Sequence, residues 1–309
     1  MREAKDMILA MSRDLGMLPG HLQKIIRTAP LRYKVFSIPK RKGGLREVAQ
    51  PAREVKSIQR WLIADLSRTL PLHESATAYR QGASIKDNAA RHVDSEYILK
   101  MDFRNFFPSI LMEDIVSHLV RHCPDEYDSS AMQLIAYVCT WAPRRQRPLR
   151  LCIGAPSSPL LSNSLLFEFD ELIAQHAAEH GAIYTRYADD LTFSTSVPDV
   201  LNSFPDMVRD LVGQLAYPRL AINEGKTVFA SRAGRRVITG VTITNDHRLS
   251  IGRERKRAIR AMYHHMLRGS LDDKGQQELR GLIAFAENIE PGFKMWLEEM
   301  AKARPRGET

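Results

Sequence analysis

The sequence predicts an α+β fold in which short strands and longer helices follow one another along the chain. Runs of alternating or β-branched residues are bounded by turn residues, and segments with apolar residues at helical spacing separate them. A chain of 309 residues can also bury a substantial core, divided among two or three subdomains.

The expected elements follow from these two periodicities. Helices are expected where apolar residues share one helical face, or where a cap residue such as Ser84 precedes such a face. One or two are expected over residues 3–26, and others over 55–70, 84–92, 112–122, 129–139, 158–178, 200–215, 253–267, 273–287 and 291–302. Strands are expected over 33–38, 97–103, 182–187 and 191–194, with short ones within 228–244. Gly43-Gly44 predicts a hairpin turn after the first strand.

Positive charge is concentrated in a few stretches of the chain. The formal net charge is +9 and the pI is about 9.5, which favours a polyanionic partner. Of the 45 Lys and Arg residues, 18 fall within residues 32–46, 144–150, 232–236 and 253–260. A charge run is usually a solvated face, but this clustering favours contact with nucleic acid.

The three cysteines, Cys123, Cys139 and Cys152, are odd in number and lack metal-ligand spacing. They predict neither a disulfide framework nor a zinc site, and they suit a reducing, cytoplasmic location. The most apolar N-terminal run, Met7–Met11, is too short for a signal peptide or a membrane span, so no membrane partner is expected.

Three aspartates form the most informative pattern in the chain. Asp189 and Asp190 follow Tyr187-Ala188 at an expected turn between strands, and Asp102 ends an earlier strand. An isolated Asp-Asp pair is usually a solvated turn. Three carboxylates that converge from a strand end and a hairpin tip, however, suit two divalent ions in phosphoryl transfer. Oxygen ligands favour two Mg²⁺ ions, with Mn²⁺ as a substitute.

Two further segments and the Asp189-Asp190 motif follow one another along the chain in a characteristic order. The two segments are Met101-Asp102-Phe103-Arg104-Asn105-Phe106-Phe107-Pro108-Ser109-Ile110 and Gly154-Ala155-Pro156-Ser157-Ser158-Pro159. Together with Tyr187-Ala188-Asp189-Asp190, they resemble a reverse transcriptase over most of the chain. The resemblance implies a right-hand polymerase with fingers, palm and a small helical thumb. It implies an N-terminal helical extension over 1–30, interleaved fingers and palm over 31–245, and the thumb over 246–309.

Three shorter segments resemble elements of retron reverse transcriptases. They are Asn88-Ala89-Ala90-Arg91-His92, Val237-Ile238-Thr239-Gly240 and the stretch 38–46, which group II intron enzymes share. The retron resemblance implies an RNA-directed DNA polymerase that copies a structured noncoding RNA into multicopy single-stranded DNA. It further implies priming from an internal guanosine 2′-hydroxyl, and an antiphage unit with a separate effector protein.

The resemblance implies roles for the residues around the aspartates. Asp102, Asp189 and Asp190 are expected to be catalytic metal ligands, with the Phe103 carbonyl as a candidate further ligand. Lys226 matches a lysine that follows the palm hairpin in similar polymerases, where it would protonate the departing pyrophosphate. A surface lysine without a catalytic role is the alternative.

A second group is expected to hold the incoming deoxynucleoside triphosphate. Phe107 would pack beneath the sugar and exclude a 2′-hydroxyl, although a core aromatic is equally compatible with the composition. Lys40 and Arg46 flank the glycine turn and would bind the triphosphate. Gly154-Ala155-Pro156 would allow close backbone approach. Ile153 stands where many relatives carry Gln, so a polar contact to the nucleotide is absent or supplied elsewhere.

A third group is expected to contact nucleic acid. Asn88 and His92 share one helical face, and either recognise the cognate RNA or support the fold beside it. A basic stripe on the first thumb helix is expected to follow a duplex backbone; it consists of Arg253, Lys256, Arg257 and Arg260.

Two other functions remain open at this point. The chain also resembles other bacterial reverse transcriptases, of the group II intron or diversity-generating types. A protein of a different class, an RNA–DNA scaffold that restrains an effector protein, is the second alternative. Intact Asp102, Asp189 and Asp190 argue against a scaffold without polymerase activity.

Overall fold

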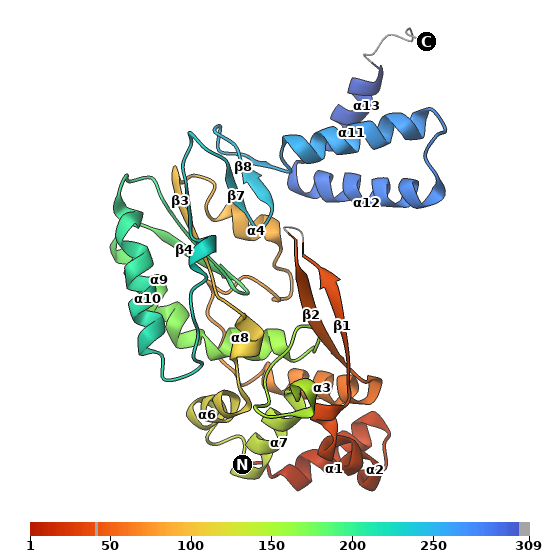
Figure 1. Ribbon diagram of the computed structural model, residues 1–309, viewed down its shortest axis with the longest axis vertical. Helices are drawn as coiled ribbons and strands as arrows, with labels where there is room; N and C mark the ends of the chain where they lie inside the picture. Colours follow the sequence, from red (N-terminus) through yellow and green to blue (C-terminus); the bar gives the residue numbers. More distant parts are fainter. Residues whose placement is uncertain (41–42, 303–309) are drawn as a thin grey trace.

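A four-stranded antiparallel sheet forms the centre of the structure (Figure 1). The computed structural model describes residues 1–40 and 43–302. The sheet has the order β4–β5–β3–β6, with β3 at Tyr97–Asp102, β4 at Ile183–Tyr187, β5 at Asp190–Thr195 and β6 at Val228–Ala230. Because β5 pairs with both β3 and β4, the register places Asp102 opposite Asp190. The three expected aspartates therefore meet at one end of the sheet.

Helices from the first two thirds of the chain share one apolar core with this sheet. They are α1 (Ala4–Leu15), α2 (Pro19–Arg27), α3 (Arg53–Leu66), α5 (Phe106–Ser109), α6 (Met112–His122), α7 (Ser129–Cys139), α8 (Ser158–Leu165), α9 (Phe167–Glu179) and α10 (Phe204–Gln214). Met7 of α1 and Leu22 of α2 belong to the same buried cluster as Leu99 and Phe193 of the sheet. Residues 1–30 thus pack into the central core.

A second, smaller core lies toward the C-terminus. It joins α4 (Ile85–Ala90), β7 (Arg236–Ile238), β8 (Val241–Ile243), β9 (Leu249–Ser250), α11 (Arg253–Leu267), α12 (Asp273–Ile289) and α13 (Phe293–Lys302). Ala89, Ile238 and Leu279 are fully buried within it. Figure 1 shows α11 and α12 side by side at one end of the molecule. The three helices expected in the C-terminal tail are confirmed.

The expected N-terminal hairpin is also present. β1 (Tyr33–Pro39) and β2 (Leu45–Pro51) pair antiparallel and form a separate two-stranded sheet. Gly43 and Gly44 have φ values of 89° and 81°, in a left-handed region that glycine adopts at little cost. Arg41 and Lys42, between the strands, lie outside the described residues. Val48 and Ala49 bury the base of the hairpin against the body.

The prediction of one continuous helix over 158–178 is wrong. The chain leaves helical geometry at Leu166, whose φ and ψ are −98° and 14°, and so divides the segment into α8 and α9. This break allows Asn163 in α8 and Asp170 in α9 to contact the same buried side chain, Arg186.

Short 3₁₀ helices complete the architecture, at Ala29–Leu31, Pro143–Arg145, Val200–Ser203 and Glu224–Lys226. The third of these and α10 together fill the segment where one helix was expected over 200–215. Across residues 1–40 and 43–302, the helices are either too short or too polar to cross a membrane.

A buried ion pair connects the central hairpin to α8 and α9. Arg186 in β4 and Asp170 in α9 both have side chains that are 0 % exposed, and their closest nitrogen and oxygen lie 2.5 Å apart. Arg186 also donates to the Asn163 side chain at 3.1 Å, and Tyr184 donates its hydroxyl to Asp170 at 2.7 Å. A buried charge is tolerated only with such compensation, so this network fixes β4 relative to both helices.

We expect Arg186→Met to lower the free energy of unfolding by about 3–5 kcal/mol, because it leaves the Asp170 carboxylate buried without its partner. The double variant Arg186→Met/Asp170→Leu should be more stable than Arg186→Met alone, since no uncompensated charge remains. Urea unfolding of the three proteins measures both effects.

A matched control is the exposed ion pair between Arg209 and Glu224, which are 41 % and 57 % exposed. Arg209→Met should change stability little, because solvent already screens this pair. Equal losses for Arg186→Met and Arg209→Met would contradict the role assigned to the buried pair.

Candidate active site

Three carboxylates converge where β3 ends and the β4–β5 hairpin turns. The turn residue Ala188 is buried and has a φ of 57°, a left-handed conformation that side chains adopt at a cost. Two hydrogen bonds hold the turn: Arg186 Nη1 donates to the Ala188 carbonyl at 3.1 Å, and the Phe103 N–H donates to the Asp189 carbonyl at 3.0 Å. The Asp pair is therefore presented on a rigid tip.

Asp102 is held by groups from the segment that leads into β6. Lys226 Nζ lies 2.7 Å from its Oδ2, and Asn223 Nδ2 donates to its Oδ1 at 3.1 Å. The Asn223 N–H also donates to the Asp102 carbonyl at 2.7 Å. The Asp102 side chain is 4 % exposed, whereas that of Lys226 is 55 % exposed. Lys226 thus reaches the site from the solvent side.

The crowding of negative charge shifts the pKa values of the hairpin aspartates. Loss of water contact, followed by the charges of Asp189 and Asp102, raises the pKa of Asp190 to about 7, although its side chain keeps an accessible surface. Burial and the Asp102 charge raise the pKa of Asp189. Burial alone would lower the pKa of Lys226, but its hydrogen bond to Asp102 and the three carboxylates outweigh burial and raise it.

This set of donors fits a divalent cation. Asp102, Asp189 and Asp190 supply oxygen ligands, which hard ions such as Mg²⁺ prefer. Burial, followed by mutual repulsion, raises the pKa values of Asp189 and Asp190, and a positive ion would relieve that repulsion. Without an ion, the ammonium of Lys226 provides part of this compensation.

The raised pKa of Asp190 predicts a pH-dependent stability in the absence of metal. Its folded pKa of about 7 lies above the reference value of 3.8, so ionisation disfavours the folded state. This penalty is absent below about pH 4, grows as the pH rises, and is complete above about pH 7. Asp190→Asn removes it. In chelator, the variant should melt roughly 2 °C higher than the unchanged protein at pH 8, and at the same temperature at pH 4.

Thermal melts at pH 4 and pH 8, with chelator and then with excess Mg²⁺, check this expectation. Mg²⁺ should stabilise the unchanged protein more than Asp190→Asn, because the variant lacks one ligand. A variant that melts below the unchanged protein in chelator at pH 8 would contradict the charge-repulsion argument.

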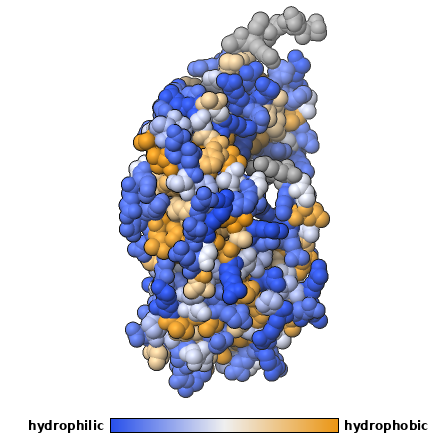
Figure 2. Space-filling model, turned by 60° about the vertical axis from the view of Figure 1, so that its left-hand side comes forward, coloured by the Kyte–Doolittle hydropathy of each residue, from blue (hydrophilic) through white to orange (hydrophobic). Residues whose placement is uncertain are grey.

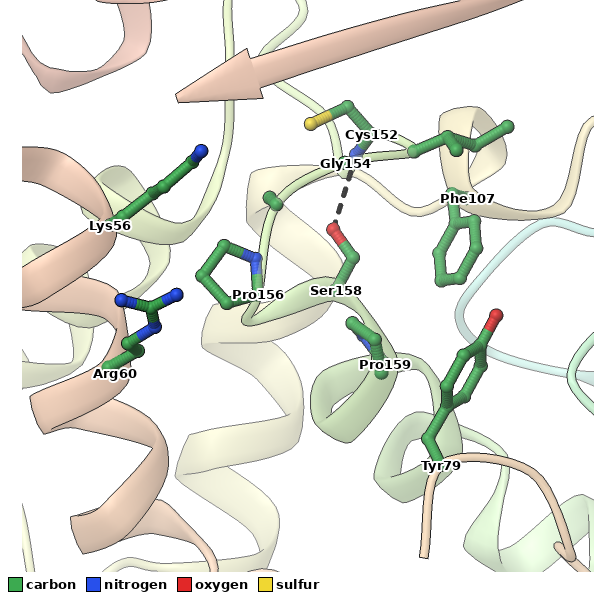
Figure 3. Close-up of a pocket in the computed structure, with 11 residues that line it drawn as sticks. Lys56, Arg60, Tyr79, Phe107, Cys152, Gly154, Pro156, Ser158 and Pro159 are labelled. Atoms are coloured by element: carbon green, nitrogen blue, oxygen red, sulfur yellow. Dashed lines mark hydrogen bonds between the residues drawn. The ribbon is translucent and has the colours of Figure 1, made fainter. Parts of the chain in front are cut away.

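A cavity of about 340 Å³ contains most of the residues expected to contact the nucleotide (Figure 3). Phe107 and Gly154-Ala155-Pro156 line it together with Ile153. Tyr79 forms another part of the wall and has a φ of 62°, a conformation in which a bulky residue is strained. Figure 3 shows the rings of Tyr79 and Phe107 on the same side of the cavity.

Gly154 permits the close approach of two segments at this cavity. Its φ is 115°, and a Cβ atom there would lie 2.9 Å from the Ala49 carbonyl oxygen and 3.0 Å from Val48 Cγ1. The Ala49 N–H donates to the Ile153 carbonyl at 2.9 Å. Glycine is therefore required where the cavity wall meets β2.

Lys40 and Arg46 are exposed on the β1–β2 hairpin. Arg46 lies near enough to the aspartates for its charge to oppose the rise in the pKa of Asp189. Lys40 follows β1 directly, and its N–H donates to the Gly44 carbonyl at 2.9 Å. Of these two residues, Arg46 is therefore the one whose charge acts on Asp189.

The structure contradicts direct nucleic-acid contact by Asn88 and His92, because both side chains are 0 % exposed. His92 lies 2.7 Å from the hydroxyls of both Ser194 and Thr185, one through each ring nitrogen. Burial lowers the pKa of His92 to about 3, so its ring is neutral. Asn88 accepts a hydrogen bond from Thr77 at 2.9 Å. The pair supports the fold by joining α4 to the central sheet.

The expected basic stripe on α11 is also corrected at one position. Arg253, Arg257 and Arg260 are exposed, as the prediction requires. Lys256 instead turns inward, pairs with Glu290 at the end of α12, and lies 5.9 Å from the centre of the Trp296 ring. Helical spacing alone did not distinguish Lys256 from its exposed neighbours.

Sequence reasoning missed several residues that shape the site. Lys56 and Arg60 of α3 line the cavity opposite the Tyr79 side (Figure 3), and their spacing of four residues was the available signal. Arg186 was detectable as a lone charge in a largely apolar strand next to the Asp pair. Asn223 gave no signal, because its contact with Asp102 depends on the fold.

Tyr79, which lines the cavity, lies near enough to Asp189 for that charge to add to burial in raising the pKa of the Tyr79 hydroxyl. Clustered carboxylates near a cavity bordered by basic residues are typical of a nucleic-acid polymerase. Residues 38–260 match the family "Reverse transcriptase (RNA-dependent DNA polymerase)". The Retron Ec83 reverse transcriptase of Escherichia coli is 44% identical over 86% of this chain and 86% of its own length. The Retron Ec73 reverse transcriptase of Escherichia coli is 33% identical, over 90% and 89%. The Retron Mx65 reverse transcriptase of Myxococcus xanthus is 32% identical, over 99% and 72%.

A solved structure supports the fold independently. The foamy viral protease–reverse transcriptase in complex with double-stranded DNA has a TM-score of 0.51 and 16% identity, over 89% of this chain and 40% of that chain. The chain therefore belongs to the reverse transcriptase family, with a right-hand polymerase fold, and within that family to the retron type. It is an RNA-directed DNA polymerase whose family depends on divalent metal ions, and its partners are nucleic acids.

Proposed function

We propose that this polymerase copies part of a folded noncoding RNA into multicopy single-stranded DNA, with an internal 2′-hydroxyl as the primer. It would act in the cytoplasm, in an antiphage unit that includes a separate effector protein. The similarity to retron enzymes over most of their length supports the proposal. The single observation that carries it is the intact set of three aspartates, with Asp102 at the end of β3 opposite Asp189 and Asp190 on the hairpin tip.

The proposed division into fingers, palm and thumb follows the sequence rather than the two cores, since α4, β7 and β8 of the second core lie within residues 31–245. Residues 31–245 would form the fingers and palm, and 246–309 the thumb, of which 303–309 lie outside the described residues. Residues 1–30 would support the fingers from below, since α1 packs on α3 and α7.

The aspartates would hold two Mg²⁺ ions, or Mn²⁺ in their place, with the Phe103 carbonyl as a further ligand. Such ions acidify the attacking sugar hydroxyl and stabilise the charge of the departing pyrophosphate. Lys226 would act as the proton donor to pyrophosphate, and its raised pKa keeps it charged. This role requires Lys226 to leave Asp102, which the exposed, flexible lysine stem allows.

The cavity would receive the incoming deoxynucleoside triphosphate next to the aspartates. Phe107 would lie against the sugar, with Gly154-Ala155-Pro156 giving a close-fitting wall. Lys40 and Arg46, on the hairpin above, would bind the triphosphate. Ile153 supplies an apolar side chain to the cavity and uses its carbonyl to bind Ala49, so it offers no side-chain hydrogen bond to the nucleotide.

Basic groups at both ends of the site would hold the nucleic acid. Lys56 and Arg60 border the cavity from α3, and Arg253, Arg257 and Arg260 project from α11. Contacts from such side chains to phosphates position a strand without reading its sequence. They support binding of an RNA–DNA duplex between α3 and α11.

The decisive experiment is to express the protein with its own upstream genomic region and to extract nucleic acid. We expect a discrete, ribonuclease-resistant DNA whose mobility changes after treatment with debranching enzyme. Asp189→Asn/Asp190→Asn should abolish this DNA, because two of the three metal ligands lose their charge. Gel analysis of the extracted DNA measures both results.

Controls separate the alternatives. Arg209→Met, at an exposed ion pair, should leave the DNA unchanged. Heterogeneous DNA without a branch would retain the polymerase but overturn priming from a 2′-hydroxyl. Bound RNA without any DNA in the unchanged protein would overturn the proposal and favour a scaffold that restrains an effector.

Phe107→Ala should relax discrimination against ribonucleotides. Removal of the ring opens space for a 2′-hydroxyl, and discrimination that rests on such a steric contact corresponds to about 10–200-fold. Single-nucleotide incorporation, measured as kcat/KM for a ribonucleotide and its deoxy counterpart, gives the ratio. Unchanged discrimination, with deoxynucleotide incorporation intact, would show that Phe107 is a core aromatic instead.

A further inference from the structure

The last turn of α9 presents three side chains of metal-ligating type on one helical face. His176, Glu179 and His180 are three and four residues apart, a spacing that aligns side chains along a helix. One ligating atom from each, an imidazole nitrogen or a carboxylate oxygen, lies within 4.8 Å of the others. The two imidazole rings stack with their centroids 4.2 Å apart.

Neighbouring groups orient these side chains. His180 Nδ1 donates a hydrogen bond to the His176 carbonyl oxygen at 2.9 Å, which leaves Nε2 as the nitrogen that can bind a metal. Gln175 Nε2 donates to Glu179 Oε1 at 2.9 Å and fixes the carboxylate on the same face. The ring of Phe204 meets both imidazoles edge-on, at centroid distances of 5.5 and 6.2 Å, and limits their rotation. Such outer contacts are typical of metal-binding histidines.

We propose that His176, Glu179 and His180 form a binding site for a borderline transition-metal ion, with Zn²⁺ as the best match. Imidazole nitrogens favour Zn²⁺ over the hard ions that suit the aspartates. In a tetrahedral site, bonds of about 2.0–2.2 Å place the ligand atoms roughly 3.3–3.6 Å from one another. The exposed ends of these side chains can close the remaining distance by small rotations. A fourth position stays open to water.

The place of the site in the fold suggests what the ion would do. α9 and α10 lie on the left in Figure 1, and Figure 2 brings that side forward, with hydrophilic and hydrophobic residues intermingled on it. The site ends one residue before Gly181, where the chain turns from α9 toward β4. Asp170, which binds Arg186, belongs to the same helix. The ion would therefore stabilise the helix that supports the catalytic hairpin.

The test uses the full-length protein, stripped of metal and returned to buffer with excess Mg²⁺ so that the aspartates do not compete. Zn²⁺ is titrated by calorimetry, and Co²⁺ is added in parallel to report ligation by its visible absorption. We expect one Zn²⁺ equivalent in the unchanged protein. The variant His176→Gln/His180→Gln should bind Zn²⁺ with an affinity at least about tenfold lower than that of the unchanged protein. Zn²⁺ should raise the melting temperature of the unchanged protein only.

The matched control is His264→Gln/His265→Gln on α11. The rings of these histidines lie 6.3 Å apart, and within residues 1–40 and 43–302 they belong to no cluster of three ligating side chains, so this variant should bind Zn²⁺ like the unchanged protein. Glu179→Gln should fold normally and bind Zn²⁺ more weakly. All variants should retain polymerase activity with Mg²⁺, because none of them alters the catalytic aspartates. Equal Zn²⁺ binding by the unchanged protein and His176→Gln/His180→Gln, or no binding by either, would overturn the proposal.

Discussion

The buried ion pair between Arg186 and Asp170 is the constraint on which the active site depends. Both side chains are fully buried, so every donor of the guanidinium must find an acceptor. Those acceptors belong to α8, to α9 and to the Ala188 carbonyl at the tip of the hairpin. A buried pair adds little net stability compared with apolar residues of similar size. Here the pair fixes the position of the turn, because only one position of the turn satisfies all the hydrogen-bond partners of Arg186.

The fixed turn has an electrostatic consequence. The β3–β5 register holds Asp102 opposite Asp190, and the hydrogen bond from Phe103 to the Asp189 carbonyl prevents the tip from moving away. The carboxylates therefore cannot separate to reduce their repulsion, which adds to the effect of burial in raising the pKa values of Asp189 and Asp190. A site that stays strained without a cation is already arranged for one, since little reorganisation is needed when the ion binds. Lys226 offsets part of the strain until then.

The sequence alone predicted the structure correctly where a local residue pattern determines it. The strands around the aspartates, the Gly43-Gly44 turn and the three C-terminal helices each follow from periodicity or from turn residues. The sequence alone did not predict the structure where contacts between distant segments determine it. The break at Leu166 allows α8 and α9 to contact Arg186, and Lys256 turns inward toward Glu290, so both features involve partners elsewhere in the chain. Lys56 and Arg60 read as an ordinary polar helix face until the fold placed them beside the cavity.

Two of the three segments that resemble retron elements, residues 88–92 and 237–240, show how those distant contacts are organised. Asn88 and His92 lie on α4 and in the turn after it, and His92 binds hydroxyls of both β4 and β5. On its other side, α4 packs in the second core, where the Ile85 carbonyl accepts a hydrogen bond from Thr239 at 3.4 Å. The Gly240 carbonyl in turn accepts a hydrogen bond from Arg255 of α11 at 2.8 Å. A continuous set of contacts therefore runs from the catalytic hairpin through α4 to the C-terminal helices. Because each partner along it is buried or half-buried, the orientation of α11 and its exposed arginines is set by the same sheet that positions the aspartates.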